Sequence, residues 1–324
     1  MKELLHNDRF RNSISWLILA IILVGVVAGI IHTTNKVDYV WRWEQIPRYV
    51  IYRDVMEIVA EDDAIVTALD KIGSDTTIVV ENRLGDEQYY TVPTDLVSLA
   101  VDDEIQSGQL LAKWDRWKAG LLLTGLLLTL EISLISIFLG IIIGLVTGLA
   151  RISSNPAPKW LAIGYIELIR GTPLLVQIYI FYFFVGQVFS LSSFMAGVLA
   201  LSFFAGAYIA EIIRAGIQSI HRGQMEAARS LGMNYYLAMR YIVLPQAFKR
   251  ILPPLAGQFI SLIKDSSLVG VIALVELTRA GREIGTSTFN YFEVFFTVAA
   301  LYLILTFSLS MIVQYLERRF AASD

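Results

Sequence analysis

The sequence predicts an all-α polytopic membrane protein, with six transmembrane helices (one extra N-terminal helix and a five-helix core) and a small β-rich external insertion. Two observations support this fold class. Of the 324 residues, 56% are hydrophobic and 17% are charged, and the mean hydropathy is +0.60. Soluble domains average about 45–50% apolar and about 25% charged residues. Apolar runs long enough to cross a bilayer also recur along the chain, which disfavours a soluble enzyme.

Composition excludes several kinds of site. The chain has no cysteine, so disulfides, thiolate nucleophiles and cysteine-ligated metals are excluded. Its three histidines lie far apart in the sequence, and we expect no metal site. The formal net charge of −3 offers no basic surface for nucleic acid, and no nucleic-acid partner is expected.

The N-terminal third has two parts. Residues 1–32 are interpreted as a cytoplasmic N-terminus and a first transmembrane helix, because residues 14–31 form an uncharged run of 18 residues. No small-residue cleavage site follows this run, which favours a retained helix over a signal peptide. Residues 33–119 contain 9 lysines and arginines against 17 aspartates and glutamates, a net charge of −8. We interpret them as an acidic external or periplasmic insertion with strands at 77–80 and 88–92.

Residues 120–324 are predicted to form the transmembrane domain. Five apolar runs cover 121–150, 160–189, 194–213, 251–274 and 292–316, and a polar loop is expected around 279–290. Lysines and arginines gather in the loops on one side of these spans. Because positive loops stay in the cytoplasm, both termini are predicted to be cytoplasmic and the insertion external.

The loop 214–250 is too long for a simple connector and carries helix signals. Gly232 is typical of a helix C-terminus, and Asn234 is suited to cap a second helix over 235–243 that Pro245 ends. The pattern predicts a short helix-turn-helix on the cytoplasmic face. It would serve either as a docking element for another protein or as an amphipathic anchor at the membrane surface.

The spacing of this loop resembles the EAA motif of ABC-importer permeases. In that family the loop docks into a groove of the ATPase subunit. The resemblance therefore implies an ATPase-coupling role for the residues that match the motif, which are Glu226, Ala227, Ala228, Gly232, Ile242, Leu244 and Pro245. It extends over most of 120–320 and narrows to permeases for polar amino acids of the histidine, arginine, glutamine or glutamate type. The similar segments are 128–133, 165–177, 207–217 and 262–268.

The front of the chain departs from that family, whose members usually have five spans. The insertion interrupts a segment that resembles the family's usual pre-helix segment, so its role is not implied by the resemblance. Contact with a binding protein and cover over part of the pore both remain open.

Ionisable residues inside spans usually face a cavity or a partner. Three pairs share an i,i+3 spacing: Glu167/Arg170, Glu211/Arg214 and Glu276/Arg279. Each pair either neutralises itself along its helix or contributes to a translocation path. The segment 171–173 predicts a kink after the first pair, because it ends in proline.

Lys264 and Asp265 could bind the carboxylate and the ammonium group of a zwitterionic amino acid, or pair across a subunit interface. The substrate or pore candidates are Glu131, Glu167, Arg170, Thr172, Gln177, Tyr208, Lys264, Asp265, Ser266 and Ser267.

The resemblance implies the transmembrane permease subunit of an ATP-driven importer for polar amino acids in the bacterial inner membrane, forming half of the pore. The implied partners are an ABC ATPase dimer, a second permease copy or paralogue, an external amino-acid-binding protein and the lipid bilayer. No Gly-Lys pair occurs to anchor nucleotide phosphates, so we expect no enzyme activity and no cofactor in this chain, with ATP and Mg²⁺ on the ATPase. The alternative is an ion-coupled secondary transporter, which would need internal repeats.

Overall fold

The computed structural model describes the backbone of residues 8–36 and 38–321, and the side chains of residues 16–36 and 38–315. It divides into two compact units, Met1–Glu44 and Gln45–Asp324, which are described separately. The first unit consists mainly of helix α1 (Asp8–Lys36), whose apolar side chains are exposed. Exposed apolar side chains over the length of a bilayer are typical of a helix that faces lipid.

The prediction of an all-α chain is wrong. The structure is 68% helix and 15% strand, and the strands form a curled half-barrel sheet in the N-terminal region. The six strands are β1 (Ile51–Val59), β2 (Ala64–Ile72), β3 (Asp75–Asn82), β4 (Glu87–Pro93), β5 (Glu104–Ile105) and β6 (Leu110–Ala119). The β-branched and aromatic residues of these segments favour strands over helices.

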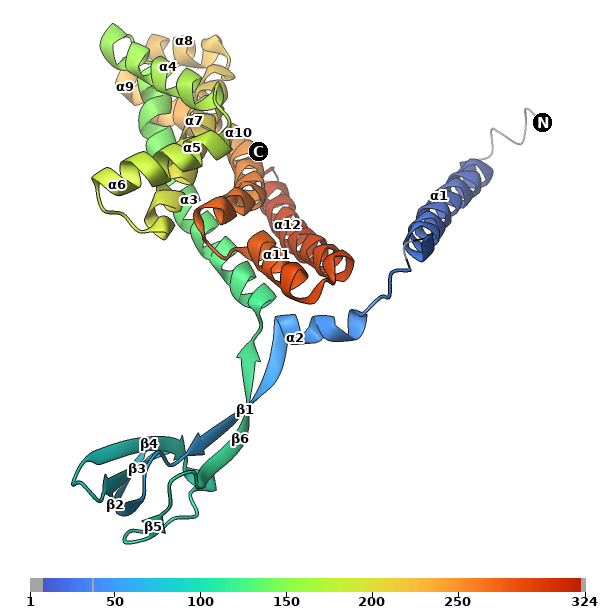
Figure 1. Ribbon diagram of the computed structural model, residues 1–324. Helices are drawn as coiled ribbons and strands as arrows, with labels where there is room; N and C mark the ends of the chain where they lie inside the picture. Colours follow the sequence, from blue (N-terminus) through green and yellow to red (C-terminus); the bar gives the residue numbers. More distant parts are fainter. Residues whose placement is uncertain (1–7, 37, 322–324) are drawn as a thin grey trace. The chain divides into compact units, whose positions relative to one another are not determined.

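The insertion consists of a sheet and a ribbon (Figure 1). The sheet has the order β4-β3-β2-β5, and its core includes Val66, Ile78 and Val92. The strands expected at 77–80 and 88–92 lie within β3 and β4. β1 and β6 pair as an antiparallel two-stranded ribbon, with cross-strand ion pairs such as Lys118 with Asp54. The hydrogen bond to this carboxylate raises the pKa of Lys118.

The two ends of the insertion meet at one point. The Gly120 nitrogen donates a hydrogen bond of 2.7 Å to the Val50 carbonyl. A Cβ at Gly120 would lie 2.3 Å from the backbone of Tyr49, so only glycine fits here. The short helix α2 (Ile46–Val50) precedes this point, and Asn290 Nδ2 donates to Gln45 Oε1 at 2.8 Å beside it. The insertion thus enters and leaves the chain where α2 meets the helical core.

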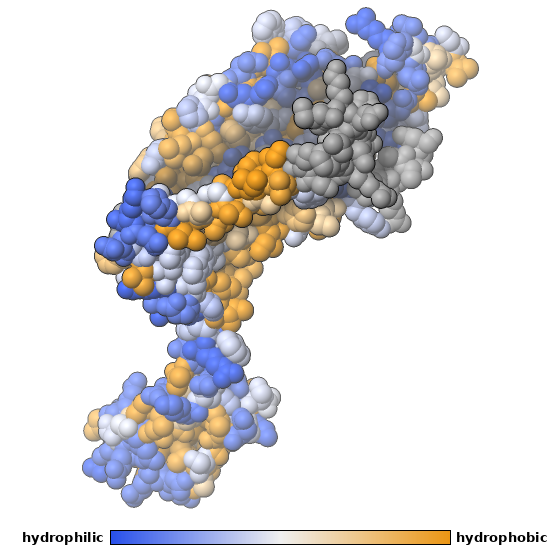
Figure 2. Space-filling model, turned by 90° about the vertical axis from the view of Figure 1, so that its right-hand side faces the viewer, coloured by the Kyte–Doolittle hydropathy of each residue, from blue (hydrophilic) through white to orange (hydrophobic). Residues whose placement is uncertain are grey.

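The helical core follows the insertion (Figure 1). Its elements are α3 (Leu121–Arg151), α4 (Pro156–Arg170), α5 (Leu174–Ile180), the π-helical turn η4 (Phe181–Val185), α6 (Gly186–Val188), α7 (Ser193–Gln218), α8 (Arg222–Ser230), α9 (Tyr235–Ala238), the π-helical turn η5 (Met239–Val243), α10 (Leu244–Asp265), the 3-10 helix η6 (Ser266–Ile272), α11 (Leu277–Thr288) and α12 (Tyr291–Ala321). Figure 2 shows broad hydrophobic areas on the surface of the helices, whereas the sheet of the insertion is largely hydrophilic.

The sequence predicts six transmembrane helices, one of them kinked at residues 171–173. Among the described residues, five helices are long and apolar enough to cross a membrane, and a sixth crossing exists if a bent pair counts as one span. This pair consists of Pro156–Arg170 and Leu174–Val188, which meet at 107°. Pro173 is the N-cap of the second helix. Because proline has no backbone N–H, it cannot donate the hydrogen bond that would continue the first helix. The run expected at 160–189 is therefore broken in its first half.

α3 and α7 form the most extensive helix contact of the core. A Cβ at Gly144 would lie 2.5 Å from Ile209 Cγ2, and one at Gly148 would lie 2.9 Å from the Ala210 carbonyl oxygen. Small residues at four-residue intervals let helix backbones approach closely in a membrane. Because successive positions of α3 meet successive positions of α7, the two helices run parallel. The bent pair between them must return the chain across the core, which makes it a crossing.

A helix replaces the polar loop expected around 279–290. α11 buries its apolar positions against α3 and α12, and these positions follow a helical period: Leu277, Ala280, Gly281, Ile284 and Gly285. Glu276 caps this helix, and its carboxylate accepts hydrogen bonds from the Thr278 and Arg279 nitrogens. The charged residues on the opposite face concealed the period.

We expect Gly144→Ala to lower the thermal inactivation midpoint in mild detergent. The added methyl group overlaps Ile209 and forces α3 and α7 apart, at a cost of about 1–3 kcal/mol. Gly164→Ala is the matched control, because a Cβ at this helical position meets nothing within 4 Å. Equal midpoints for the two variants would contradict close packing of α3 on α7.

Candidate functional site

The predicted helix-turn-helix is present between α7 and α10. Gly232 has a left-handed φ of +85° and follows α8, and the Met233 nitrogen donates to the Ala228 carbonyl at 3.1 Å across this turn. Glycine adopts this conformation without a steric cost. The Asn234 side chain accepts a hydrogen bond of 2.9 Å from the Leu237 nitrogen and so caps α9. Two short helices are thereby held at one end of the core (Figure 1).

Pro245 does not end the second helix, contrary to the sequence-based prediction. The helical run continues from Tyr235 to Ile272, and Pro245 lies in the first turn of α10. The π-helical turn η5 directly precedes it. A wider turn accommodates the missing proline N–H, because the hydrogen bonds of a π-turn reach one residue further. The loop is therefore continuous with a membrane helix.

The surface of this loop is exposed and apolar in part. Leu231 is 82% exposed, and Tyr235, Tyr236 and Tyr241 are each about 60% exposed or more. Of the motif residues, Glu226, Ala227, Gly232, Leu244 and Pro245 are also exposed, Ile242 is half-buried, and Ala228 is buried. Exposed aromatic and apolar residues next to charges are typical of surfaces that bind another protein.

A cluster of charges connects the ends of three helices beside this loop. Glu211 of α7 contacts Arg151 of α3 at 2.7 Å, Arg214 of α7 at 3.0 Å and Arg170 of α4 at 3.8 Å. Its side chain is only 16% exposed. Arg151 also contacts Glu167 at 3.7 Å. With three arginines and two glutamates the cluster has a formal charge of +1, and Glu211 is its shared anion.

Only one of the three predicted i,i+3 ion pairs occurs among the described residues, namely Glu211 with Arg214. Glu167 pairs with Arg151 of another helix, and its neighbour Arg170 contacts Glu211 and lies 5.3 Å from the Tyr208 ring centroid. The Glu276 carboxylate is used as a helix cap. An arginine is long enough to prefer a better-placed carboxylate on a neighbouring helix, so spacing along one helix does not determine the pair.

The break between α4 and α5 is closed by Gln177. This side chain is 4% exposed. Its Nε2 donates to the Ile169 carbonyl at 2.7 Å and to Thr172 Oγ1 at 2.8 Å. Carbonyls at a helix end inside a membrane need such a donor, because no water is available. The structure thus gives Gln177 and Thr172 contacts that stabilise the bend.

The remaining candidates lie on α3 and at the junction of α10 and η6. Lys264 is exposed and Asp265 is half-buried. Neither has an ion-pair partner among the described residues. Ser266 is fully buried and donates to the Ile263 carbonyl at 2.7 Å, whereas Ser267 is half-buried. Glu131 is exposed in the first half of α3 and likewise has no ionic partner within the described part of the chain.

Arg151, which pairs with Glu211 and Glu167, is not among the residues predicted from the sequence. The directions of the predicted spans already indicate which charges lie at the same depth in the membrane. α3 and α7 both end on the side of the positive loops, so Arg151 lies at the same depth as Glu211. Comparing charges at equal depth, and not along one helix, would have found this pair.

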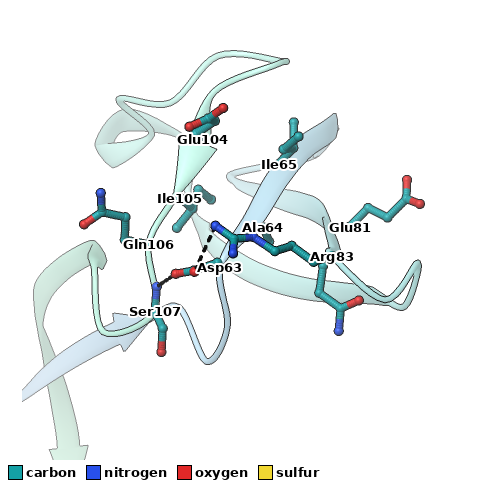
Figure 3. A pocket seen from close by; sticks show the side chains of 10 residues that line it. Asp63, Ala64, Ile65, Glu81, Arg83, Glu104, Ile105, Gln106 and Ser107 are labelled. Carbon is teal, nitrogen blue, oxygen red and sulfur yellow. Dashed lines mark hydrogen bonds and ion pairs between the residues drawn. The ribbon is translucent and has the colours of Figure 1, made fainter.

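A polar pocket of about 440 Å³ lies in the insertion, at the end of the sheet where several loops meet (Figure 3). At its centre, Asp63 accepts a hydrogen bond of 2.9 Å from the Ser107 nitrogen and contacts Arg83 at 3.4 Å. The side chain of Arg83 is 84% exposed. Asp63, at the centre of the pocket, is therefore already paired with Ser107 and Arg83. These contacts hold the loops of the insertion together.

The long exposed apolar helices, the broken span and the loop-borne helix pair define a polytopic helical membrane protein. Residues 136–322 match the family model described as "Binding-protein-dependent transport system inner membrane component", which is more than half of the chain. The chain therefore belongs to this family, as its resemblance to importer permeases predicted. Members that it resembles are transport permeases, so the chain is a transport subunit and not an enzyme.

Two relatives of the chain are themselves named as transport permeases. The chain is 43% identical over 196 residues to the "Probable glutamine ABC transporter permease protein GlnM" of Bacillus subtilis, covering 60% of this chain and 91% of that one. It is 40% identical over 205 residues to the "Arginine transport system permease protein ArtQ" of the same organism, covering 63% and 94%. About 200 residues of this chain thus match almost the whole length of each relative.

A solved structure described as "Crystal structure of an amino acid ABC transporter with histidines" is also similar. Its matched chain is 44% identical, with a TM-score of 0.59, covering 61% of this chain and 94% of that chain. The fold of the helical core is therefore that of a known transporter subunit.

We expect Glu211→Gln to lower the thermal inactivation midpoint strongly, because three arginines lose their shared anion. Removing one partner of a largely buried charge cluster costs about 3 kcal/mol. Glu283→Gln is the control, since this 42% exposed side chain forms one surface pair with Arg279, worth about 0–1 kcal/mol. A midpoint for Glu211→Gln as high as that of the control would show that Glu211 does not hold the helix ends together.

Proposed function

We propose that this chain is the permease subunit of an ATP-driven importer for polar amino acids and forms half of its translocation pore. The observation that carries the proposal is the loop 214–250, whose EAA-type residues run from α8 through the turn at Gly232 into the start of a membrane helix, α10, and are mostly exposed. The relatives named for glutamine and arginine transport support the substrate class. Two copies, or this chain and a paralogous permease, would complete the pore.

The loop supports coupling to a separate ATPase. Glu226 and Ala227 are exposed on α8, and buried Ala228 holds that helix against the core. Small alanine side chains allow close approach of a partner surface, and Leu231 adds an exposed apolar anchor. In this proposal the ATPase binds ATP and Mg²⁺, and its closure draws the loops of two permeases together. The pore then opens outward, and it opens inward again after release of ADP and phosphate.

Charge distribution supports the proposed orientation in the membrane. Arg151, Arg214 and Arg250 lie at the ends of helices that join the loop side. Positive charges at span ends favour the cytoplasm, so α8 and α9 face the ATPase and both termini are cytoplasmic. The acidic insertion then lies outside, where a soluble binding protein would deliver substrate. The three proposed segments are residues 1–32, 33–119 and 120–324, and within the second the strands of the insertion run from Ile51 to Ala119.

The substrate site is proposed at the junction of α10 and η6. Unpaired charges within a membrane span are costly and are retained for a partner. Lys264 can bind the carboxylate of an amino acid, and Asp265 can bind its ammonium group. Both lack ionic partners among the described residues, which supports a free zwitterion as the missing partner. Glu131 is a further pore candidate on the same ground.

We expect Glu226→Lys/Gly232→Asp to abolish co-purification of the ATPase in mild detergent, as measured by mass spectrometry of co-eluting subunits. The first change reverses a charge of the docking surface, and the second places a side chain at a left-handed φ. Gly73→Asp in the insertion is the matched control, because Gly73 has a φ of +65° and open space around it. An ATPase that elutes with neither wild type nor control would overturn the importer proposal and favour ion-coupled transport.

We expect Lys264→Met to raise the KM for amino-acid uptake about tenfold or more, since one charge-assisted hydrogen bond to substrate contributes about 1.5–3 kcal/mol. Asp265→Asn should act in the same direction. Lys159→Met, which removes an exposed lysine of α4, should leave KM unchanged. Double alanine substitution at Ser266 and Ser267 tests the neighbouring hydroxyls, and unchanged uptake would remove them from the site.

A further inference from the structure

We propose that a groove between α7 and α10 binds the phosphate headgroup of an anionic phospholipid. A pocket of about 480 Å³ lies there, at the loop end of both helices. It is lined by Glu211, Ile212, Arg214, Ala215, Gly216, Ser219, Arg250 and Pro254. No part of the proposed transport function uses this groove. This proposal depends on the proposed orientation of the chain only where it assigns the lipid to the cytoplasmic leaflet.

The close crossing of α7 and α10 forms the wall of the groove. A Cβ at Gly216 would lie 2.3 Å from Ile251 Cγ1, so the two helices touch at this level. Arg250 Nη1 donates a hydrogen bond of 2.6 Å to the Ser219 carbonyl and holds the start of α10 to the end of α7. The groove is thus built on a fixed contact between two membrane helices.

The groove is graded in polarity along the helices. Ile212 and Pro254 lie further from the loop than Ser219 and Arg250, and Glu211, which lies beside Ile212, is held by its ion pairs with three arginines. A lipid has the same grading, with apolar chains toward the bilayer centre and a phosphate at the surface. Basic pockets between membrane helices on the cytoplasmic side bind anionic headgroups in this way.

The charges around the groove favour an anion. Arg250 has no acidic partner among the described residues, and its single hydrogen bond is to a carbonyl. Glu211 lines the groove but is neutralised by Arg151, Arg170 and Arg214. With Glu167 included, four arginines face two glutamates, which leaves a formal charge of +2. Guanidinium groups bind phosphate oxygens with strong charge-assisted hydrogen bonds.

The test is native mass spectrometry of the delipidated transporter complex, titrated with phosphatidylglycerol, phosphatidylcholine or inorganic phosphate. We expect phosphatidylglycerol adducts on wild type, and a loss of affinity of about tenfold in Arg250→Gln. Ala215→Phe should weaken binding as well, because it fills the groove without changing charge. Arg282→Gln is the control, with the same loss of charge on an exposed arginine of α11, outside both the groove and the ATPase-docking surface.

The outcomes separate the possible anions. Equal adducts with phosphatidylcholine, or equal affinity in Arg250→Gln and Arg282→Gln, would overturn the proposal. Binding of inorganic phosphate as tight as that of phosphatidylglycerol would replace it with a soluble-anion site. If Arg250→Gln does not assemble, Ala215→Phe and the comparison of the two lipids on wild type decide the question. Uptake is not the readout, so failure here leaves the proposed transport function untouched.

Discussion

The close contact of α3 with α7 is the interaction on which the rest of the helical core depends. Glycines at four-residue intervals on α3 bring its backbone against Ile209 and Ala210. That approach places Arg151 within 2.7 Å of Glu211 at one end of the pair. Nearer the other end of α3, the Thr129 hydroxyl accepts a hydrogen bond of 3.1 Å from the Leu277 nitrogen. This bond holds the start of α11 against α3. A single helix interface therefore positions elements at both ends of the core.

Polar groups inside this core are arranged so that few are left without a partner. The bent span exposes carbonyls that the Gln177 amide satisfies, and the Glu276 carboxylate satisfies the first nitrogens of α11. Buried polar groups without partners would be costly in a membrane, where water cannot compensate. Lys264 and Asp265 differ from these groups, because neither forms an ion pair with another helix among the described residues.

Local signals were readable from the sequence, whereas contacts between helices were not. The left-handed Gly232, the Asn234 cap and the strands at 77–80 and 88–92 depend on residues close in sequence, and the structure contains them. The helical period of α11 was also present but was masked by the charges of its outer face. The angle of the break after Arg170 and the choice of Arg151 as a partner depend on where neighbouring helices lie. Long side chains select partners across space, so sequence spacing alone predicts them poorly.

The continuity of the helix from Tyr235 to Ile272 has a mechanical consequence. Tyr235 belongs to the loop-borne helix pair and Lys264 to the proposed substrate site, and 29 residues separate them on one helical run. At 1.5 Å per residue this run is about 40 Å long, and it contains the π-helical turn η5 and two prolines, Pro253 and Pro254. Displacement of its loop end would reach the proposed substrate site through the backbone of this one run. The transporter would then need no series of side-chain contacts to transmit the displacement, because both ends belong to one helical run.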